Sequence, residues 1–328
     1  MEKLEKVGRH GREKLMPMFA NRLLKNARHF GKWARRRHIS CYRIYDWDLP
    51  EFPFVIDCYD LHIHLQEFET GYDMQPHLHA LWLDEVKGIV GSVLNIQDKS
   101  IFCKWRPRHG NRAELSLAAS ASDRFVVTEN GCRFWVDLSG KLDTGLFIDH
   151  RNTRSLVAKA AAGKRFLNLF AYTGSFTVYA AMAGARSSLS VDLSRTYLDW
   201  ARENMALNRI NPLPHQFLQA DILRWMDERS EINHQFDVIM LDPPSFSNSK
   251  RMDRVLDIQA DHVSLIQGCL TMLAPDGKLF FSTNLRRFRL DEKILSGCVL
   301  FEEITKQTIP EDCHRRAHRS WILTHRRG

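Results

Sequence analysis

The clearest pattern of apolar and polar positions along the chain lies in residues 166–192, FLNLFAYTGSFTVYAAMAGARSSLSVD. The elements that it predicts are a buried strand at residues 166–170, an Ala-rich helix at residues 176–185 and a second strand at residues 189–191. Turn and helix-start residues at Tyr172, Thr173, Gly174 and Ser175 separate the first strand from the helix. The second strand ends in Asp192. In an open doubly wound sheet, ligands bind beyond the carboxyl ends of the strands, where Gly174 and Asp192 would both lie.

The same alternation of apolar runs and helical patterns continues to the end of the chain. It predicts helices at residues 156–162, 195–207, 222–229 and 255–273, and strands at residues 216–219, 236–241, 278–282, 301–308 and 319–324. Alternating strands and helices indicate an α/β fold with a mainly parallel sheet and helices on both faces. We expect the last strand to close the sheet in the antiparallel direction.

The first 138 residues have a different pattern. Residues 1–15 show no periodicity, and we expect them to be mobile. A helical period begins at Met18, with Phe19, Leu23, Ala27, Phe30 and Ala34 on one face. The elements expected after it are strands at residues 42–49, 54–59, 61–68, 100–105, 124–128 and 133–138, a helix at residues 74–94 and a polar loop at residues 105–122. We therefore expect a basic extension with a helix at residues 1–40, a small α+β domain at residues 41–138 and the α/β domain at residues 139–328.

Composition limits the class of protein. The chain has 328 residues, 44% of them hydrophobic and 26% charged, as in an ordinary soluble protein. No uncharged apolar run is long enough to span a membrane, and the charged N-terminus does not resemble a signal peptide. The seven cysteines are scattered, odd in number and never in CxxC spacing, which favours reduced thiols in the cytoplasm and no zinc site. Four histidines lack a carboxylate or thiol at ligand spacing, so we expect no metal: His62, His64, His77 and His79.

The net charge of +8 is unevenly distributed. Residues 1–40 carry +9 and residues 313–328 carry +5, so the middle of the chain carries −6. A basic head and tail on a slightly acidic body favour a polyanionic partner, most simply nucleic acid, although a solvated basic surface has the same composition. The residues that we expect to contact RNA are Arg22, Lys25, Arg28, Lys32, Arg35, Arg36, Lys250 and Arg251.

The number of glycines in the turn separates two classes of cofactor. A dinucleotide site needs a Gly-rich turn, usually with three glycines, whereas Gly174 stands alone here. An acid about 20 residues downstream, suited to a ribose diol, is present as Asp192. A single-glycine turn with this acid fits a nucleoside without phosphates, most commonly S-adenosylmethionine (SAM), although any strand-helix-strand unit can show both features.

Two further acids follow apolar strands, at Asp221 and Asp242. Asp221 suits the adenine amino group. Asp242 opens the sequence Asp242-Pro243-Pro244-Ser245-Phe246, in which two prolines remove backbone donors and make the turn rigid. Phe246 follows at a distance suited to stacking on a flat ring. We interpret this run as a pocket for an unstacked base, held between the turn and an aromatic face, with a rigid loop as the alternative.

The segment LDTGLFIDHR at residues 142–151 directly precedes the predicted cofactor half-site and is expected to cover it, unless it is only a helix cap. Asp149 lies in this segment. The residues that we expect to bind the cofactor are Asn168, Phe170, Tyr172, Thr173, Gly174, Asp192, Leu193, Ser194, Asp221, Asp242 and Asp149. Those expected to act on the substrate base are Asp242, Pro243, Pro244 and Phe246.

These motifs together resemble those of the bacterial 23S rRNA guanine-N7 methyltransferases. The matching runs are NLFAYTGSF, VDLSRTYLDWARENMALN, QAD, FDVIMLDPPSFSNSKRM, LDTGLFIDHR, FANRLLKNARHFGKWARR and YRIYDWDLPEF. The resemblance implies a class I (Rossmann-like) methyltransferase fold after a small domain, SAM as methyl donor, and N7 of guanine 2069 in 23S rRNA as target. In many bacteria this enzyme is fused to a domain that methylates guanine N2. This chain lacks that half, so a separate N2-methylating partner is implied.

Two rival functions remain from the sequence. A cytosine-C5 rRNA methyltransferase shares similar runs but attacks the base with a cysteine, usually after a later strand. The matching strand end here is Phe281-Ser282-Thr283-Asn284, without a cysteine. Guanine N7 has an in-plane lone pair and no proton to lose, so alignment suffices and we assign no general base. A non-catalytic RNA-binding assembly factor is the second rival, and the intact set of strand-end acids argues against it.

Overall fold

The protein is described by a computed structural model that covers residues 9–69, 75–106, 124–140, 143–228, 235–249, 251–252, 254–313 and 317–326, with side chains from residue 15 onward. The chain divides into two compact units. Unit 1 comprises residues 1–131 and 136–144, and unit 2 comprises residues 132–135 and 145–328. No helix among the described residues is long and apolar enough to cross a membrane. Lys250, one of the residues expected to contact RNA, lies outside the described residues.

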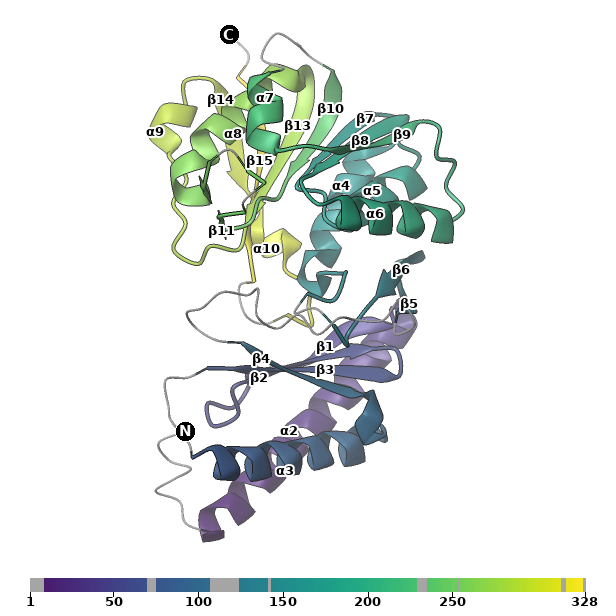
Figure 1. The fold of residues 1–328 in the computed structure, drawn as a ribbon, viewed down its shortest axis with the longest axis vertical. Helices are drawn as coiled ribbons and strands as arrows, with labels where there is room; N and C mark the ends of the chain where they lie inside the picture. The colour runs from purple at the N-terminus through teal and green to yellow at the C-terminus, as the bar shows by residue number, and fades with distance from the viewer. Residues whose placement is uncertain are drawn as a thin grey trace. The chain divides into compact units, whose positions relative to one another are not determined.

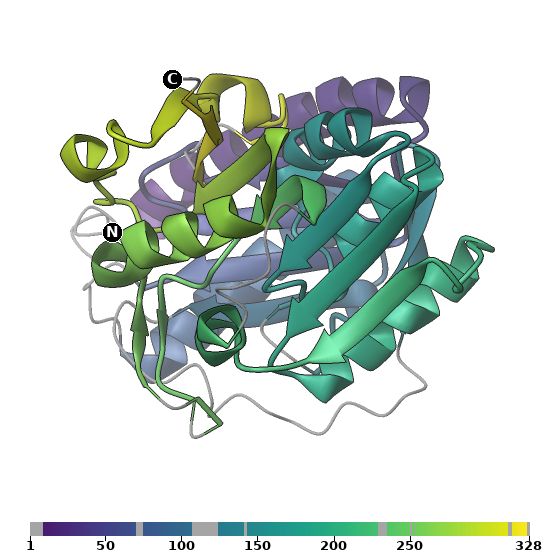
Figure 2. The same ribbon diagram turned by 90° about the horizontal axis from the view of Figure 1, so that it is seen from above.

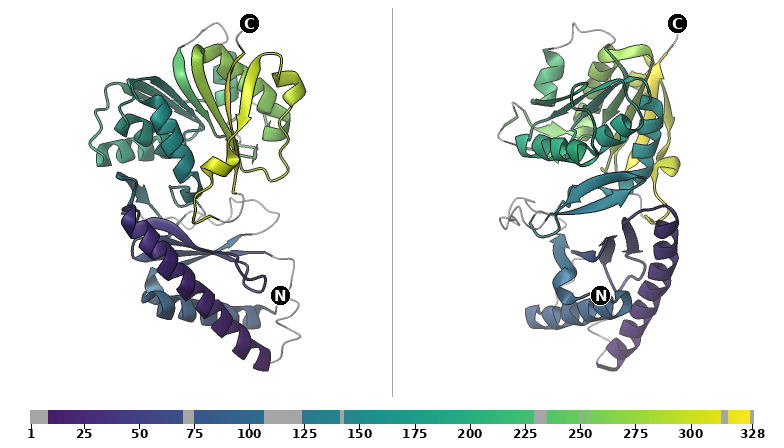
Figure 3. Two further views of the ribbon diagram at one scale, coloured as in Figure 1. Left: turned by 180° about the vertical axis from the view of Figure 1, so that it is seen from behind. Right: turned by 90° about the vertical axis from the view of Figure 1, so that its right-hand side faces the viewer.

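Unit 1 is built on a four-stranded sheet of order β1-β2-β3-β4, in which β3 and β4 are parallel and the other pairs are antiparallel. Its strands are β1 (Cys41–Asp46), β2 (Phe54–Tyr59), β3 (His62–Phe68) and β4 (Ile101–Arg106). Helices α2 (Arg9–Arg36) and α3 (Pro76–Leu94) cover one face of this sheet (Figure 3). The chain continues with β5 (Phe125–Glu129) and then β6 (Cys132–Val136). Unit 1 therefore contains both a sheet and helices, and it includes helix α2 from the segment that was expected to be a separate extension.

Helix α2 begins earlier than its apolar period predicts. The expectation that residues 1–15 have no regular structure is wrong for residues 9–15, which form the first two turns of α2. Arg, Glu, Lys and Leu are good helix formers, so this segment can be helical without a periodic apolar face. Phe19 and Leu23 are fully buried and join the core of unit 1, where Phe19 stacks on Phe52 with ring centroids 4.6 Å apart. Burial of this face therefore makes α2 an integral part of unit 1.

Unit 2 contains a seven-stranded sheet of order β14-β15-β13-β10-β7-β8-β9 (Figure 1). Its strands are β7 (Arg165–Leu169), β8 (Ser187–Asp192), β9 (His215–Gln219), β10 (Phe236–Leu241), β13 (Leu273–Thr283), β14 (Val299–Glu303) and β15 (Arg319–His325). Strands β7, β8, β9, β10 and β13 are parallel to one another, whereas β15 runs antiparallel to both β13 and β14. The chain enters at β7, continues outward to β9, and returns to β10 on the other side of β7. The point between β7 and β10 is therefore the topological switch point of the sheet.

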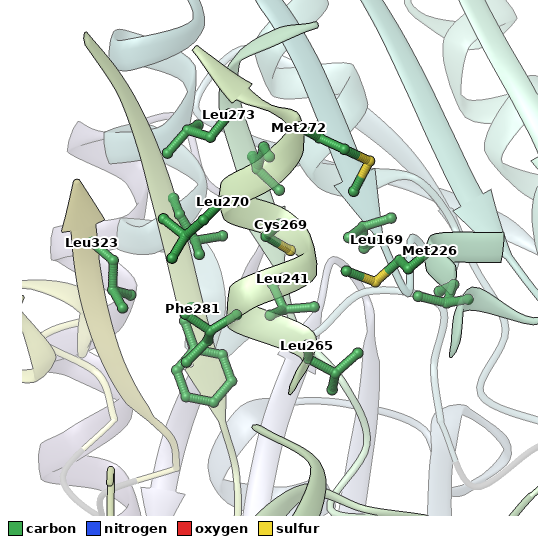
Figure 4. Close-up of a cluster of buried hydrophobic side chains, with 14 of the residues drawn as sticks. Leu169, Met226, Leu241, Leu265, Cys269, Leu270, Met272, Leu273, Phe281 and Leu323 are labelled. Atoms are coloured by element: carbon green, nitrogen blue, oxygen red, sulfur yellow. The ribbon is translucent and has the colours of Figure 1, made fainter. Parts of the chain in front are cut away.

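Helices cover both faces of this sheet, as expected (Figure 2). The helices of unit 2 are α4 (Arg151–Ala161), α5 (Ser175–Met182), α6 (Arg195–Leu207), α7 (Ile222–Asp227), α8 (Ile258–Met272), α9 (Glu292–Leu295) and α10 (Thr305–Thr308). Along β7, Phe166 packs with α4 and α5, whereas Leu167 and Leu169 face the core formed with α7 and α8. Figure 4 shows this second core around α8, with Cys269 and Leu270 pointing toward the strands. The alternation of side chains along apolar strands thus creates two cores.

The predicted strand at residues 301–308 is wrong in its second half. Strand β14 spans Val299–Glu303, and α10 follows at Thr305–Thr308. The β-branched residues of this segment suggested a longer strand. The Thr305 hydroxyl instead donates to Glu303 at 2.8 Å and accepts the backbone N–H of Ser320 at 3.1 Å. These tertiary contacts end the strand and begin the short helix.

Candidate functional site

The candidate site lies at the carboxyl ends of β7, β8, β9 and β10, beside the topological switch point. The turn after β7 carries three residues with positive φ: Phe170 at 56°, Tyr172 at 50° and Gly174 at 73°. The backbone N–H of Tyr172 donates to Asp192 Oδ2 at 2.8 Å, and the N–H of Ala171 donates to the carbonyl of Val191 at 3.1 Å. The turn is therefore held against the end of β8, as the sequence predicts.

Gly174 fits a position that no other residue can occupy without a shift. A Cβ atom built there would lie 2.7 Å from the Cβ of Ala201 in α6. Gly174 is also the N-cap of α5, in the left-handed region that favours glycine. The turn and α6 thus approach more closely than a side chain allows.

The segment before α4 is attached to the same turn. The backbone N–H of Gly145 donates to the Tyr172 hydroxyl at 3.0 Å, and the Gly145 carbonyl accepts from the Thr173 hydroxyl at 2.6 Å. The Asn204 amide of α6 donates to the carbonyl of Thr173 at 2.9 Å. The ring of Phe147 lies 5.2 Å from that of Tyr172. Gly145 and Phe147 of this segment therefore contact the turn after β7, where the segment was expected to lie.

Asp192 uses both carboxylate oxygens to hold backbone, since Oδ1 accepts the N–H of Ser194 at 2.8 Å while Oδ2 accepts that of Tyr172. Burial raises the pKa of Asp192 above its usual value, and these two N–H groups act in the opposite direction. Each oxygen keeps a second lone pair, so the carboxylate can also accept hydroxyls of a ribose. The Ser194 side chain caps α6, and the Leu193 carbonyl accepts from Gln219 at 3.2 Å.

Asp221 and Asn168 both make contacts within the fold. Asp221 is half-buried at the end of β9 and caps α7 by accepting the N–H of Leu223 at 3.1 Å. Asn168 is buried, and its amide donates to the Thr177 hydroxyl at 3.0 Å. Asp221 therefore lies on the expected edge, while the Asn168 amide group is engaged inside the fold.

The Asp-Pro-Pro run follows β10 at this edge. The Ser282 hydroxyl at the end of β13 donates to Asp242 Oδ1, and the Ser245 hydroxyl donates to the amide oxygen of Asn284. Pro243 is buried and Pro244 is exposed. Phe246 is 60% exposed in β11 (Phe246–Ser247), which pairs with β12 (Leu256–Asp257). Asp242 is thus fixed on one oxygen, while the Phe246 ring remains open to solvent.

Asp149 meets two histidines that the sequence did not single out. The Oδ2 atom of Asp149 lies 3.4 Å from Nδ1 of His318, whose Nε2 is 3.0 Å from the Thr308 hydroxyl. The rings of His318 and His150 stack at 4.1 Å with their planes 13° apart, and Nε2 of His150 lies 3.6 Å from Oδ2 of Asp242. The motif LDTGLFIDHR includes His150, but no spacing in the sequence relates it to His318.

A cavity of about 360 Å³ adjoins this cluster and is lined by residues 283–286 and 317–319. Its volume falls at the small end of the range for ligand pockets. Asn284 and His318 contribute to its wall, and both also contact the elements that hold Asp242. This edge of the sheet therefore includes a hollow within the size range of ligand pockets.

None of the seven cysteines occupies the end of β13, where Ser282 and Thr283 stand. Cys269 is fully buried in α8, and burial raises the pKa of its thiol well above the usual value. Cys298 is exposed and lies immediately before β14. No described feature supplies the thiolate that attack on cytosine C5 requires.

The basic residues predicted on α2 all lie on its exposed side. Arg22, Lys25, Arg28, Lys32, Arg35 and Arg36 are exposed, whereas the apolar face of the helix is buried. Arg22 approaches Asp48 at 3.9 Å. Arg251 in unit 2 is also exposed. The exposed face of α2 therefore carries all six of these basic side chains.

Comparison with known proteins gives the family. A family model described as S-adenosylmethionine-dependent methyltransferase matches residues 90–303. "Ribosomal RNA large subunit methyltransferase K" of Neisseria meningitidis is 50% identical over 309 residues, which cover 94% of this chain and 87% of that protein. "Ribosomal RNA large subunit methyltransferase K/L" of Allochromatium vinosum is 47% identical over 315 residues, covering 94% of this chain but 42% of that protein. The chain therefore spans less than half the length of the K/L relatives.

Solved structures agree on the fold. SMU.776, a methyltransferase crystallised with SAH, superposes with a TM-score of 0.75 at 23% identity, covering 94% of this chain and 81% of that one. A methyltransferase from Streptococcus mutans gives a TM-score of 0.73 at 22% identity with the same coverage. With the one-glycine turn, the acid at the end of β8 and the switch point already in place, the chain belongs to the S-adenosylmethionine-dependent methyltransferase family, together with relatives named ribosomal RNA large subunit methyltransferase K.

Proposed function

We propose that the protein methylates N7 of a guanine in 23S rRNA, acting in the cytoplasm. The proposal depends on one observation at the sheet edge formed by β7, β8 and β10. Asp242 lies there beside the expected cofactor half-site, and none of the seven cysteines lies at the end of β13, where cytosine-C5 chemistry would need one. The names of the relatives, which refer to the large ribosomal subunit, support rRNA as the substrate. From the resemblance to the guanine-N7 enzymes, we also propose that a separate enzyme methylates guanine N2 of the same rRNA.

The residues of the half-site fit a nucleoside cofactor. The Gly174 turn leaves no room for a side chain, and Asp192 keeps free lone pairs on both oxygens. We assign Asp192 to the ribose of SAM, Asp221 to its adenine, and the Tyr172–Gly174 turn with Leu193 and Ser194 to the surrounding backbone contacts. When bound, SAM supplies an electrophilic methyl group.

The protein's own contribution is alignment and charge. N7 of guanine carries an in-plane lone pair and loses no proton, so the site needs no general base. The ring becomes positive as N7 gains a methyl group, and a fixed carboxylate nearby stabilises that charge. Asp242, held by Ser282, accepts hydrogen bonds from N1 and N2 of the guanine, while the rigid prolines keep its position and Phe246 stacks on the base.

Methylation of guanine N2 is the second candidate. A carboxylate such as Asp242, half-exposed at the strand end, is the type of group that accepts a proton from an exocyclic amine. The two reactions leave different products, because N7-methylguanosine permits chemical cleavage of the RNA chain whereas N2-methylguanosine does not. The decisive experiment incubates the protein with labelled SAM and unmodified 23S rRNA, and then maps the label and the cleavage position.

The same assay tests Asp242. We expect Asp242→Ala to abolish methyl transfer and to leave the dissociation constant of SAM nearly unchanged. Asp227→Ala, which alters an exposed acid of α7, is the matched control and should retain full activity. Full activity of Asp242→Ala would exclude this residue from the reaction. Saturable SAM binding by the wild-type protein without transfer to any RNA would favour a non-catalytic assembly factor.

The basic surface on α2 is proposed to bind RNA phosphates. Deletion of residues 1–40 would not test RNA binding alone, because it would also remove Phe19 and Leu23 from the core of unit 1. A better test replaces four exposed residues of α2 with Gln, which leaves the buried face intact: Arg28, Lys32, Arg35 and Arg36. Each lost phosphate contact should reduce the slope of log K against log salt by about 0.7 to 0.9, so the slope of the fourfold variant should fall by up to about 3.6.

A matched control removes four exposed charges near the amino ends of the strands in unit 2: Lys164, Arg186, Arg209 and Lys278. It has the same net charge as the α2 variant, so a smaller change in its salt slope would show that position matters. Equal slopes in the two variants would show that α2 is not a phosphate-binding surface.

A further inference from the structure

A connected row of side chains leads from Asp242 into the interior of unit 2. Asp242 lies 3.6 Å from Nε2 of His150, and His150 stacks on His318 at 4.1 Å. His318 contacts Asp149 through Nδ1 and Thr308 through Nε2. His150 and His318 are both buried, whereas Asp242 is 24% exposed at the edge of the sheet. The row therefore has one end at the proposed base-binding carboxylate and the other inside the fold.

His150 is held in its neutral form. Burial lowers the pKa of His150, Asp242 and Asp149 act to raise it, and His318 and Arg154 act in the same direction as burial. The Nδ1 atom of His150 has no hydrogen-bond partner and is shielded from solvent. A buried unpaired N–H is costly, so the proton belongs on Nε2, which faces Asp242.

The cluster of Asp149, His150 and His318 has the composition of a metal site, since one ligand atom from each lies within 4.8 Å of the others. Its ring geometry favours another use. The planes of the two imidazoles are only 13° apart at a centroid distance of 4.1 Å, so their in-plane lone pairs run side by side. Ligands of one ion must instead converge on a point. Both nitrogens of His318 also already face oxygen partners.

We propose that His150 is a positioning residue for methyl transfer. Its neutral Nε2–H lies 3.6 Å from Asp242 Oδ2, beyond hydrogen-bond distance here, and donates to that oxygen when the base is bound, which orients the carboxylate. The stacked His318, anchored by Asp149 and Thr308, holds His150 in place. This inference rests on the proposed role of Asp242. With Ser282 on one oxygen and His150 next to the other, the carboxylate has a fixed plane, and a neutral His150 does not cancel its charge. A positively charged partner at this position would cancel that charge, which the guanine ring needs as it becomes positive.

Two substitutions of His150 separate its roles. His150→Phe keeps a flat ring of similar size that can stack on His318 but removes the donor. His150→Gln removes the ring and places an amide N–H near the former position of Nε2. We expect His150→Phe to lower kcat on unmodified 23S rRNA about tenfold to a hundredfold, with KM and the SAM dissociation constant little changed. His150→Gln should recover most of the lost rate.

The pH profile provides a readout that a packing role would not change. Since the pKa of His150 is lowered from 6.5, the wild-type kcat should fall only at pH values below 6.5, where protonated His150 would pair with Asp242. The groups that face His150 are Asp242, His318, Asp149 and Arg154, and all remain in the His150→Gln variant. That variant should therefore lose the acid limb that depends on His150 while the other groups still titrate.

The outcomes are distinct. Equal kcat in His150→Phe and the wild type would overturn the inference, as would a rate lost equally in both variants with unchanged pH profiles, because packing would then explain the loss. A decrease of kcat on treatment with EDTA, restored by zinc, would overturn it in favour of a metal. If Asp242→Ala is fully active, the proposed function of Asp242 fails first, whereas an inactive Asp242→Ala beside a normal His150→Phe refutes only the positioning role. Urea unfolding of both variants verifies that they are folded.

Discussion

Substitution of Gly174 tests whether the one-glycine turn controls cofactor affinity. The backbone at Gly174 has φ of 73°, and a Cβ would lie 2.7 Å from the Cβ of Ala201. An alanine in the left-handed region costs about 1–2 kcal/mol, and forcing a methyl group into a packed contact costs about 1–3 kcal/mol more. Lower entropy of the unfolded chain returns about 0.4–1 kcal/mol. The net loss of stability for Gly174→Ala is therefore about 3 kcal/mol, within a range of about 1–5 kcal/mol.

Gly163 is the matched control, because its φ of 70° is nearly the same but its Cβ would meet nothing within 4 Å. Gly163→Ala should cost between about 0 and 1.6 kcal/mol from backbone strain alone. The difference between the two variants isolates the contact with Ala201. Urea unfolding measures both free energies.

The second assay is SAM affinity by calorimetry. Relief of the clash at Gly174 must move the turn or α6, and this turn carries Tyr172, whose N–H is bound to Asp192. We expect Gly174→Ala to weaken SAM binding by at least about tenfold, equivalent to about 1.4 kcal/mol, and Gly163→Ala to bind normally. Wild-type affinity in Gly174→Ala, or equal stability of the two variants, would refute the reasoning.

Two further predictions concern buried charge. His64 is buried in β3 with its pKa lowered to about 3 by burial, and by Arg106, Lys104 and Arg43, so the unfolded chain alone binds this proton between pH 6.5 and 3. The free energy of unfolding should therefore decrease as the pH is lowered through this window, by up to about 1.4 kcal/mol per pH unit. In urea unfolding from pH 6 to 4, His64→Phe should show a shallower decrease than the wild type. An identical slope in the two proteins would contradict the assignment. The ion pair of Arg151 with Asp312, at 2.6 Å and with side chains 2% and 0% exposed, predicts that Asp312→Ala loses about 3–5 kcal/mol in the same assay, and a loss below about 1 kcal/mol would count against it.

The cofactor half-site and the elements around it could be predicted because their determinants are local. The turn glycine, the acid at the end of β8 and the helix at residues 195–207, whose predicted bounds equal those of α6, all follow from short patterns. Period and cap residues act within a few positions, so a sequence displays them directly. The assignments of individual residues to SAM and RNA remain predictions.

The row of side chains behind Asp242 could not be predicted from such patterns. His150 and His318 stand 168 positions apart in the chain, and their stacking depends on the direction of β15. The missed start of α2 and the shortened strand β14 have a related cause. In each case contacts distant in the sequence, or a helix without an apolar face, decide the structure.

The antiparallel direction of β15 has a consequence for the timing of assembly. Arg319 at the start of β15 pairs with Thr283 at the end of β13, so β15 enters the sheet from the edge that carries the site and brings His318 there first. A growing chain that has folded only through β13 already contains the SAM half-site and Asp242, but it lacks the ring that packs against His150. Asp242 and His150 are therefore synthesised before their neighbour His318. The row of side chains is complete only when β15 has joined the sheet.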